Sequence, residues 1–234
     1  MDKGVEGWIF RPRLAGATGL QRLIACGGAA LAIMLSYLAC KAAALGPAGL
    51  PILAASVGAS AVLLFVVPSS PLAQPWPVIG GTSLSAMIGI AVGDMVPEPA
   101  LAGGIAVGLA ILVMSLLRCL HPPGGGAALG MAVIAPAFPD AGYAVVIAPF
   151  GINSVAIVLC AMAYHRFTRH SYPHRPGVPA SAAPAAPVAA SGLHIEDIDK
   201  ALVDLGETFD ISRADLDLLL NHAELHAKAR CARS

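Results

Sequence analysis

Long apolar runs separated by short polar breaks dominate the first 168 residues of the chain. Most of these runs reach the roughly 17 to 25 residues that an α-helix needs to cross the hydrocarbon core of a bilayer. Six runs are predicted as spanning helices, and the fifth is shorter than the others: 23–45, 50–67, 78–96, 99–117, 124–138 and 142–165. The pattern therefore predicts an all-α fold, a polytopic transmembrane helix bundle.

Composition agrees with a transmembrane bundle and limits the classes of binding partner. Hydrophobic residues make up 57% of the chain and charged residues 12%, whereas soluble proteins carry about 25% charged residues. Basic and acidic residues number 14 each, so no net field attracts nucleic acid. The five cysteines are scattered without a CxxC spacing, which argues against a disulfide framework or a zinc knuckle. The lipid bilayer is the expected partner.

Composition also divides the chain into four parts: a basic N-terminal tail (1–22), a transmembrane domain (23–168), a Pro/Ala-rich linker (169–192) and an amphipathic helical tail (193–234). The linker has the composition of a flexible or extended segment. Apolar residues at helical spacing in the tail predict two short helices, the second capped at Ser212. Two short helices are small for an independent domain, which leaves docking onto a partner, or onto a second subunit of a homo-oligomer, open.

Basic residues flank the predicted bundle. Four of them precede the first apolar run, and Arg166, Arg169 and Arg175 follow the last. Because Lys and Arg accumulate in short cytoplasmic segments, both termini are predicted to be cytoplasmic and the number of crossings to be even. Six crossings place Arg118 on the cytoplasmic side, and four crossings with two paired re-entrant segments keep the same ends inside. The expected location is the cell inner membrane of a bacterium.

Small residues recur at four-residue spacing along three of the predicted helices. Such stripes allow helix backbones to approach closely in lipid, where no hydrophobic force drives helices together. The stripes are Gly28, Ala32, Ser36 and Cys40; Gly81, Ser85, Gly89 and Gly93; and Gly104 with Gly108. Tight packing, rather than ligand binding, is the favoured interpretation for any single glycine among them.

The segment RCLHPPGGGAALG, which starts at Arg118, joins the fourth and fifth predicted helices. Its two prolines end one helix, and Gly124, Gly125 and Gly126 open the next with backbone N–H groups that no side chain covers. A helix N-terminus with free amides attracts anions. Arg118 adds a fixed positive charge and His121 a pH-dependent one. The segment therefore predicts a binding site for a small inorganic anion.

A second segment of the same design precedes the third predicted helix. Gln74-Pro75 matches His121-Pro122, and Gly80-Gly81 matches the first two glycines of the other segment, which suggests a weak parallel repeat. Paired interrupted segments in the two halves of a chain point to a transport site. The residues expected to contribute to the anion site from this segment are Gln74, Gly80, Gly81, Thr82 and Ser83. A tight interhelical turn, with Arg118 as a surface anchor, is the alternative explanation.

Several ordered motifs over about residues 15 to 168 resemble the HPP family of membrane proteins. They are GASAVLLF at 58–65, SPLAQP at 70–75, IGG at 79–81 and HPPG at 121–124. The resemblance implies a transmembrane domain and, through members in chloroplasts and cyanobacteria, transport of nitrite. Many bacterial members carry a pair of CBS domains after the membrane part. The tail from His194 resembles the connector that precedes those domains, which are not expected in this chain.

Transport of a small inorganic anion, with nitrite favoured, is the leading functional hypothesis. In the alternative, the membrane part is a sensor or scaffold that signals through its cytoplasmic helical tail. An enzyme has the least support, because the predicted bundle offers no carboxylate pair, nucleophile triad or metal cluster. His222 and His226 have helical spacing but no evident third ligand, so no metal is assigned. No cofactor is expected.

Overall fold

The computed structural model describes residues 19–43, 55–137, 142–144, 146–168, 170–175, 195–205 and 210–231. Every regular element in these ranges is helical, and the ranges contain no strand. The N-terminal residues up to 18 and most of the predicted linker, from 176 to 192, lie outside them. The all-α prediction is confirmed.

A described helix overlaps each of the six predicted spans. The membrane region contains α2 (Gly19–Ala43), α3 (Ala55–Val66), η1 (Pro71–Ala73), η2 (Pro77–Gly81), α4 (Thr82–Met95), α5 (Pro99–Leu116), α6 (Pro122–Ile134), η3 (Ala135–Ala137), η5 (Val146–Ile152) and α7 (Asn153–Thr168). Two further helices, α8 (Ile195–Leu205) and α9 (Arg213–Cys231), form the tail. The predicted boundaries shift by a few residues, and α2 begins at Gly19 instead of residue 23.

Four of these helices are long and apolar enough to cross a membrane: Gly19–Ala42, Pro77–Met95, Pro99–Leu116 and Pro149–Thr168. The described α3 has 12 residues and α6 has 13, which at about 1.5 Å per residue give roughly 18 and 20 Å. Both lengths fall short of a hydrocarbon core of about 30 Å. The six helices therefore match the prediction in position, while the short α3 and α6, which contact each other, also fit the alternative with four complete crossings.

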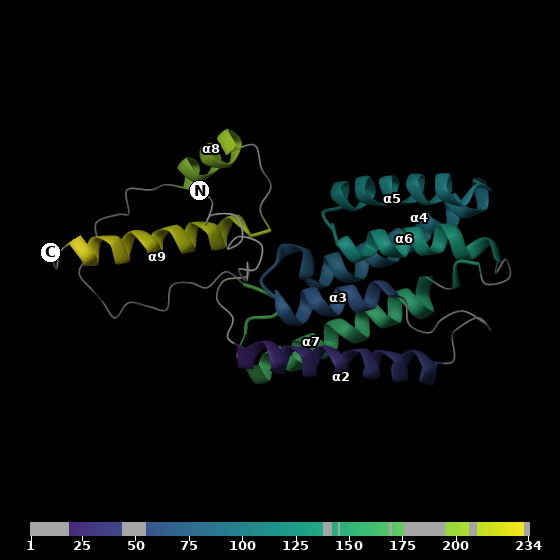
Figure 1. Cartoon of the computed structure of the whole chain (residues 1–234), viewed down its shortest axis with the longest axis horizontal. Coiled ribbons are helices and arrows are strands. Elements are labelled where there is room, and N and C mark those ends of the chain that lie inside the picture. The colour runs from purple at the N-terminus through teal and green to yellow at the C-terminus, as the bar shows by residue number, and fades with distance from the viewer. Residues whose placement is uncertain are drawn as a thin grey trace, which may run out of the picture.

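Both predicted site segments lie at one end of the bundle, which we call the motif end (residues 67–76, 117–121 and 170–175). In Figure 1, α2, α4 and α6 begin at this end, α3, α5 and α7 finish there, and α8 and α9 lie beyond it. The indole N–H of Trp76 donates to the carbonyl of Leu117 across the end at 3.2 Å. The buried hydroxyl of Tyr172 donates to the carbonyl of Ala73 at 2.9 Å, and burial raises the pKa of that phenol.

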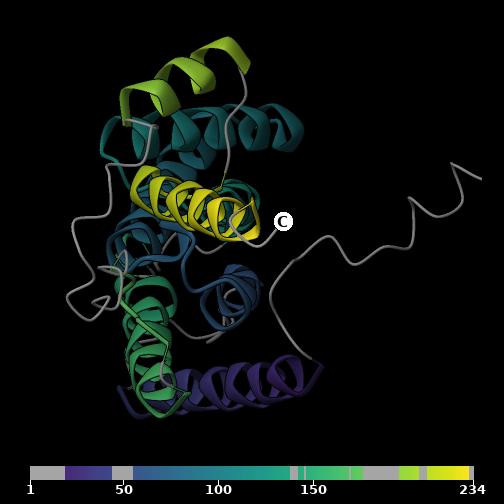
Figure 2. The ribbon, with the colours of Figure 1, turned by 90° about the vertical axis from the view of Figure 1, so that its left-hand side faces the viewer.

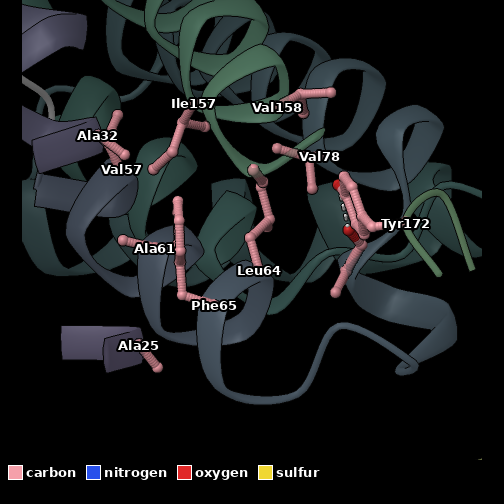
Figure 3. Packing of buried hydrophobic residues seen from close by; sticks show 12 residues of the cluster. Ala25, Ala32, Val57, Ala61, Leu64, Phe65, Val78, Ile157, Val158 and Tyr172 are labelled. Carbon is pink, nitrogen blue, oxygen red and sulfur yellow. Dashed lines mark hydrogen bonds between the residues drawn. The ribbon is translucent and has the colours of Figure 1, made fainter. Parts of the chain in front are cut away.

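Two groups of three helices each enclose an apolar cluster, and a third cluster joins α4, α6 and η5. The helices α2, α3 and α7 share one apolar cluster, in which Leu64 and Ile157 are fully buried (Figure 3), and α4, α5 and α6 share another. Viewed along the bundle in Figure 2, α2 and α7 lie on one side and α5 on the other. The outer faces expose large apolar side chains such as Leu23, Leu112 and Leu159, as expected for helices in lipid.

Glycines hold α4 against α6 at backbone distance. A Cβ added at Gly89 would lie 2.4 Å from the carbonyl oxygen of Ala128, and one added at Gly93 would lie 2.6 Å from that of Ala132. Residue numbers rise together on the two helices, so α4 and α6 run parallel. The small-residue stripe predicted on α4 is therefore a packing face. The helices α4 and α6 also begin at the same end of the bundle, as the predicted parallel repeat requires.

The other two stripes behave differently from each other. On α2, a Cβ at Gly28 would lie 2.7 Å from the ring of Tyr164, and Cys40 donates to Oδ1 of Asn153 at 3.2 Å. These contacts make α2 and α7 antiparallel neighbours and confirm the stripe as a packing face. The pair predicted on α5 is wrong, because Gly104 and Gly108 are exposed with open space beside them. An apolar face toward lipid has the same composition as one toward protein.

Candidate functional site

The helix α5 ends in a Schellman turn in which Arg118 occupies the position usually taken by glycine. The N–H of Cys119 donates to the carbonyl of Met114 at 2.8 Å, and the N–H of Arg118 donates to that of Ser115 at 3.2 Å. Arg118 has a φ of 54°, a left-handed conformation that costs a residue with a side chain about 1–2 kcal/mol. The Arg118 side chain is exposed, so its charge lies at the surface of the motif end.

His121 is fully buried, and both of its ring nitrogens have partners. Nδ1 lies 2.8 Å from the carbonyl oxygen of Leu72, and Nε2 lies 2.8 Å from the hydroxyl of Ser60. One side chain therefore joins α3, the short helix η1 and the start of α6. The pH-dependent positive group expected from the sequence is, in the structure, a buried cross-link between three elements.

The protons shared by this histidine and its serine can be counted. A carbonyl oxygen only accepts, so a neutral His121 carries its proton on Nδ1 and accepts at Nε2. The Ser60 hydroxyl has one proton and two acceptors within reach, Nε2 at 2.8 Å and the carbonyl of Ser56 at 3.0 Å. Ser60 therefore donates to the neutral ring, and it would turn to Ser56 only if the ring gained a second proton.

The backbone amides at the start of α6 do not form the predicted anion funnel. Pro122 and Pro123 have no N–H, and the N–H of Gly124 donates to the carbonyl of His121 at 2.8 Å. Gly125 and Gly126 follow in the first turn of the helix. The prediction overlooked that two prolines and a tight first turn remove most of the donors that a helix start normally leaves open.

The glycines of the two segments allow the segments to touch. A Cβ at Gly81 would lie 2.5 Å from the carbonyl oxygen of Cys119, and one at Gly124 would lie 3.1 Å from that of Gly81. Gly80 is covered by the ring of Trp76, 2.9 Å from where its Cβ would be. These three predicted site residues therefore act through close packing: a Cβ at Gly81 would meet a backbone carbonyl, and one at Gly80 or Gly124 would require a neighbouring side chain to shift.

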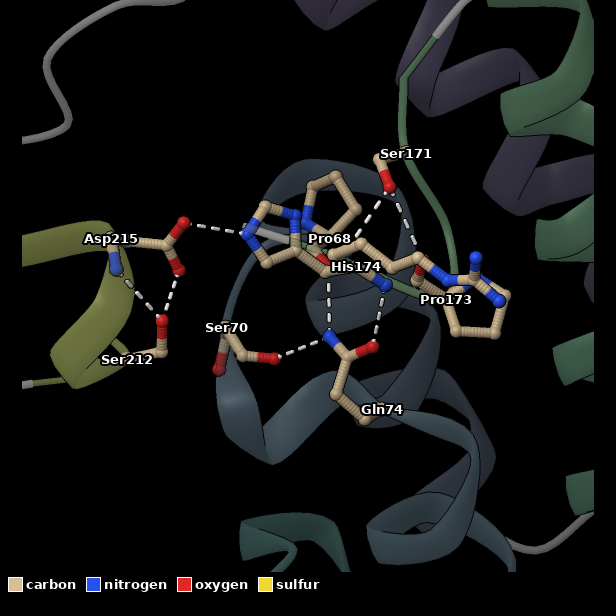
Figure 4. A network of polar contacts seen from close by, with 9 residues as sticks. Pro68, Ser70, Gln74, Ser171, Pro173, His174, Ser212 and Asp215 are labelled. Atoms are coloured by element: carbon tan, nitrogen blue, oxygen red, sulfur yellow. Dashed lines mark hydrogen bonds and ion pairs between the residues drawn. The ribbon is translucent and has the colours of Figure 1, made fainter. Parts of the chain in front are cut away.

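Gln74 uses its whole amide group inside the motif end (Figure 4). Nε2 donates to the carbonyls of Pro68 at 3.0 Å and Ser70 at 2.8 Å, and Oε1 accepts from the N–H of His174 at 2.8 Å. The side chain therefore ties the segment after α7 to the loop before η1. With both N–H groups of the amide in use, Gln74 supports the site and offers no spare donor to an anion.

Thr82 and Ser83 follow the second glycine pair and face different surroundings. Thr82 is 1% exposed, and its hydroxyl has no hydrogen-bond partner in the described part of the chain. Ser83 is half-buried and lines a pocket of about 600 Å³ whose other walls are apolar residues of α2, η2, η5 and α7. Of the ten predicted site residues, the structure brings Gly81, His121 and Gly124 into contact, while Arg118 lies on the surface.

Sequence reasoning missed two further unpaired hydroxyls inside the bundle. Ser36 on α2 and Ser56 on α3 are 0% and 6% exposed, and neither hydroxyl has a hydrogen-bond partner among the described residues. It also missed Ser60 as the partner of His121. A signal was present, because Ser36 lies in a small-residue stripe and Ser60 in the GASAVLLF motif. The small size of serine explained both positions without any polar role.

The start of the tail helix α9 reaches the motif end as well (Figure 4). Ser212 caps α9 as predicted, since its hydroxyl accepts from the N–H of Asp215 at 3.1 Å. Oδ1 of Asp215 lies 2.8 Å from Nε2 of His174, and Asp210 accepts from the hydroxyl of Ser70 at 2.7 Å. Partial burial opposes the charge of Asp215, but hydrogen bonds from Ser212 and His174 outweigh it and lower the pKa of the carboxyl.

Other candidate ligands of the sequence lie apart from this site. His222 and His226 are exposed on α9, and nowhere in the described ranges do three metal-ligating side chains come together. Cys26, Cys40, Cys119 and Cys160 form no disulfide in the described part of the chain.

The fold and the site define a polytopic helical membrane protein built around a buried histidine turn. The chain belongs to the HPP family, because it matches the family's transmembrane region over residues 16–173, more than half of its 234 residues. Two transmembrane proteins of Dictyostelium discoideum are similar to it. One is 36% identical over 131 residues, which are 54% of this chain and 46% of the relative. The other is 35% identical over 123 residues, 50% of this chain and 39% of the relative. The chain thus spans less than half the length of these curated relatives, and no solved structure matches it.

Proposed function

We propose that this protein carries a small monovalent inorganic anion across the membrane, with nitrite as the first candidate. The proposal rests on the buried hydroxyls of Ser36, Ser56 and Thr82, which have no hydrogen-bond partner among the described residues. A buried donor left unpaired costs about 1–3 kcal/mol. Two of these groups lie on the contacting helices α2 and α3 and the third on α4, and all three are explained if they serve a polar guest that enters the bundle.

The polarity of the interior favours an anion as that guest. The buried polar residues of the described chain are Ser, Thr, Asn and His, and none of them is Asp, Glu, Lys or Arg. Hydroxyl protons point their positive end at a negative ion, whereas a cation would need carboxylates or rings of carbonyl oxygens. Without a fixed countercharge the ion is held weakly, and weak binding is what allows an ion to leave again.

The buried hydroxyls of Ser36 and Ser56 lie close to contacts between helices. Cys40 on α2 donates to Asn153 on α7, and Ser36 lies one helical turn from Cys40. Ser56 lies one turn from Ser60, the partner of the buried histidine. An anion that moves between these helices would meet a hydroxyl, thiol or amide group at successive turns.

In the proposed mechanism, Arg118 raises the local concentration of anions at the mouth of the pathway. A second proton on His121 would turn the Ser60 hydroxyl from the ring to the carbonyl of Ser56. The step would change which donors face the pathway and would couple proton movement to anion movement. Transport without chemical conversion needs no catalytic residue and no cofactor.

Nitrite uptake into proteoliposomes by Ser36→Ala and Thr82→Val variants tests the proposal. Each substitution removes one unpaired hydroxyl, so uptake should fall about tenfold while thermal stability stays equal or rises. Ser115→Ala is the matched control, because Ser115 is exposed on α5 and its hydroxyl donates to the carbonyl of Ile111 at 2.7 Å. Wild-type uptake by both buried-hydroxyl variants, at equal protein content, would contradict the proposal.

A sensor or scaffold is the second candidate, and the contact of the tail with the motif end favours it. Asp210 and Asp215 contact the motif end next to Gln74. The short segment that contains Gln74 also contacts the buried histidine. Truncation after residue 176 separates the two functions. A carrier keeps its uptake without the tail, whereas a sensor loses the part that reports its state.

A further inference from the structure

We propose that a second pocket at the motif end binds an acidic phospholipid whose headgroup carries both a phosphate and a hydroxyl, as phosphatidylglycerol does. The pocket has a volume of about 370 Å³ and lies between the start of α2, the end of α3 and the end of α7. Arg22, Phe65, His165, Phe167 and His170 are among the residues that line it. It is separate from the hydroxyl pathway assigned to the transported anion.

His165 gives the pocket a hydrogen-bond acceptor that lacks a donor. The ring is 1% exposed, and its Nε2 lies 2.8 Å from the carbonyl oxygen of Leu64. Because a carbonyl only accepts, Nε2 carries the proton and Nδ1 keeps a lone pair. Nδ1 has no hydrogen-bond partner among the described residues. The rings of Tyr164 and Tyr172 lie beside the imidazole at centroid distances of 4.9 and 5.4 Å. A fixed, buried acceptor in the wall of a pocket suits a guest with a hydroxyl group.

The same pocket has a positive charge and no negative one in its described lining. Arg22, in the first turn of α2, lines it together with Gln21, and a guanidinium binds phosphate oxygens through paired N–H donors. His170 lines it too, with its ring 5.8 Å from that of His165. A guest that complements the positive charge and the histidine acceptor combines an anionic phosphate with a hydroxyl donor.

The rest of the wall distinguishes a lipid from free phosphate. It is apolar, and its members include Ile24, Ala25, Phe65 and Phe167. Phe167 is 86% exposed at the end of a spanning helix, where aromatic and basic side chains lie at the level of lipid headgroups. An acyl chain can follow this wall while the phosphate meets Arg22. Inorganic phosphate would leave the apolar wall without a partner.

The experiment measures lipid bound to the purified full chain by native mass spectrometry, with lipids of identical acyl chains. Phosphatidylglycerol should bind about tenfold more tightly than phosphatidylcholine, because only the former keeps a net negative charge for Arg22. It should bind about three- to tenfold more tightly than phosphatidylmethanol, which has the same charge and no hydroxyl for His165. Arg22→Gln should remove most of the preference over phosphatidylcholine. Arg166→Gln, an exposed basic residue on α7 outside the pocket, should keep it.

Each contrary result overturns a defined part of the proposal. Equal binding of phosphatidylglycerol and phosphatidylcholine, or equal losses in both arginine variants, would mean that only a general basic surface attracts lipid. Equal binding of phosphatidylglycerol and phosphatidylmethanol would remove His165 from the site. Displacement of the lipid by inorganic phosphate alone would assign the pocket to free phosphate instead. The readout is lipid binding, so the outcome is independent of which ion is transported.

Discussion

Gly89→Ala probes the close parallel packing of α4 and α6. The added Cβ would lie 2.4 Å from the carbonyl oxygen of Ala128 and 2.9 Å from Cβ of Met131. Ordinary contact begins at 3.4 Å, so the two helices must move apart by about 1 Å at this level. Overpacking of this kind costs about 1–3 kcal/mol. Because Gly81 directly precedes α4 and Gly124 lies on α6, the displacement should loosen the motif end and lower nitrite uptake.

Gly108→Ala provides the matched control. It adds the same methyl group to a glycine of α5 that has nothing within 4 Å of the new atom. Alanine is favoured over glycine inside a helix by about 0.5–1 kcal/mol. Thermal unfolding of the two variants, purified in the same detergent, should therefore shift in opposite directions from wild type. A Gly89→Ala protein as stable as wild type would refute the close approach of α4 and α6.

Three further predictions concern the motif end. Arg118→Gly should raise stability by about 1 kcal/mol, because glycine adopts positive φ without strain, while uptake falls most at low ionic strength, which thermal unfolding and initial rates report. His121→Ala should destabilise the bundle by more than about 2 kcal/mol, since it removes the buried cross-link and leaves the Leu72 carbonyl unpaired. Burial lowers the pKa of His121 to about 4, so the variant should also lose any pH dependence of uptake near pH 4. The lowered pKa of Asp215 means that its contribution to tail docking is complete above the ordinary carboxyl value of 3.8 and is lost as the pH falls through the lowered pKa. Asp215→Asn should therefore make the tail more sensitive to limited proteolysis at neutral pH, and unchanged cleavage would exclude the contact.

The positions of the membrane helices could be predicted from the sequence, because bilayer thickness sets the length of an apolar run. The runs that became α2, α4, α5 and α7 have that length, and the structure confirms them. Which face of each helix packs against a neighbouring helix could not be predicted equally well. Gly89 and Gly108 look alike along the chain, yet one lies against a neighbouring backbone and the other is exposed. Only the packed structure distinguishes a surface that meets protein from one that meets lipid.

The candidate site could be predicted in part. The sequence singled out His121 and the two glycine pairs, and the structure brings His121, Gly81 and Gly124 together. The hydrogen-bond partners of His121 could not be predicted, since the Ser60 hydroxyl and the Leu72 carbonyl lie 61 and 49 residues away along the chain. The sequence prediction counted too many free amides at the start of α6, because prolines that end one helix also remove N–H donors from the first turn of the next.

Uptake of a panel of ions into proteoliposomes that contain the purified chain tests the central claim most directly. Nitrite, nitrate, chloride, phosphate and sodium are compared with empty liposomes under the same ion and pH gradients. Saturable uptake of nitrite, with slower uptake of the other monovalent anions and none of sodium, is the predicted result. No anion uptake above that of empty liposomes, from protein that is folded and oriented in the membrane, would contradict a transport function.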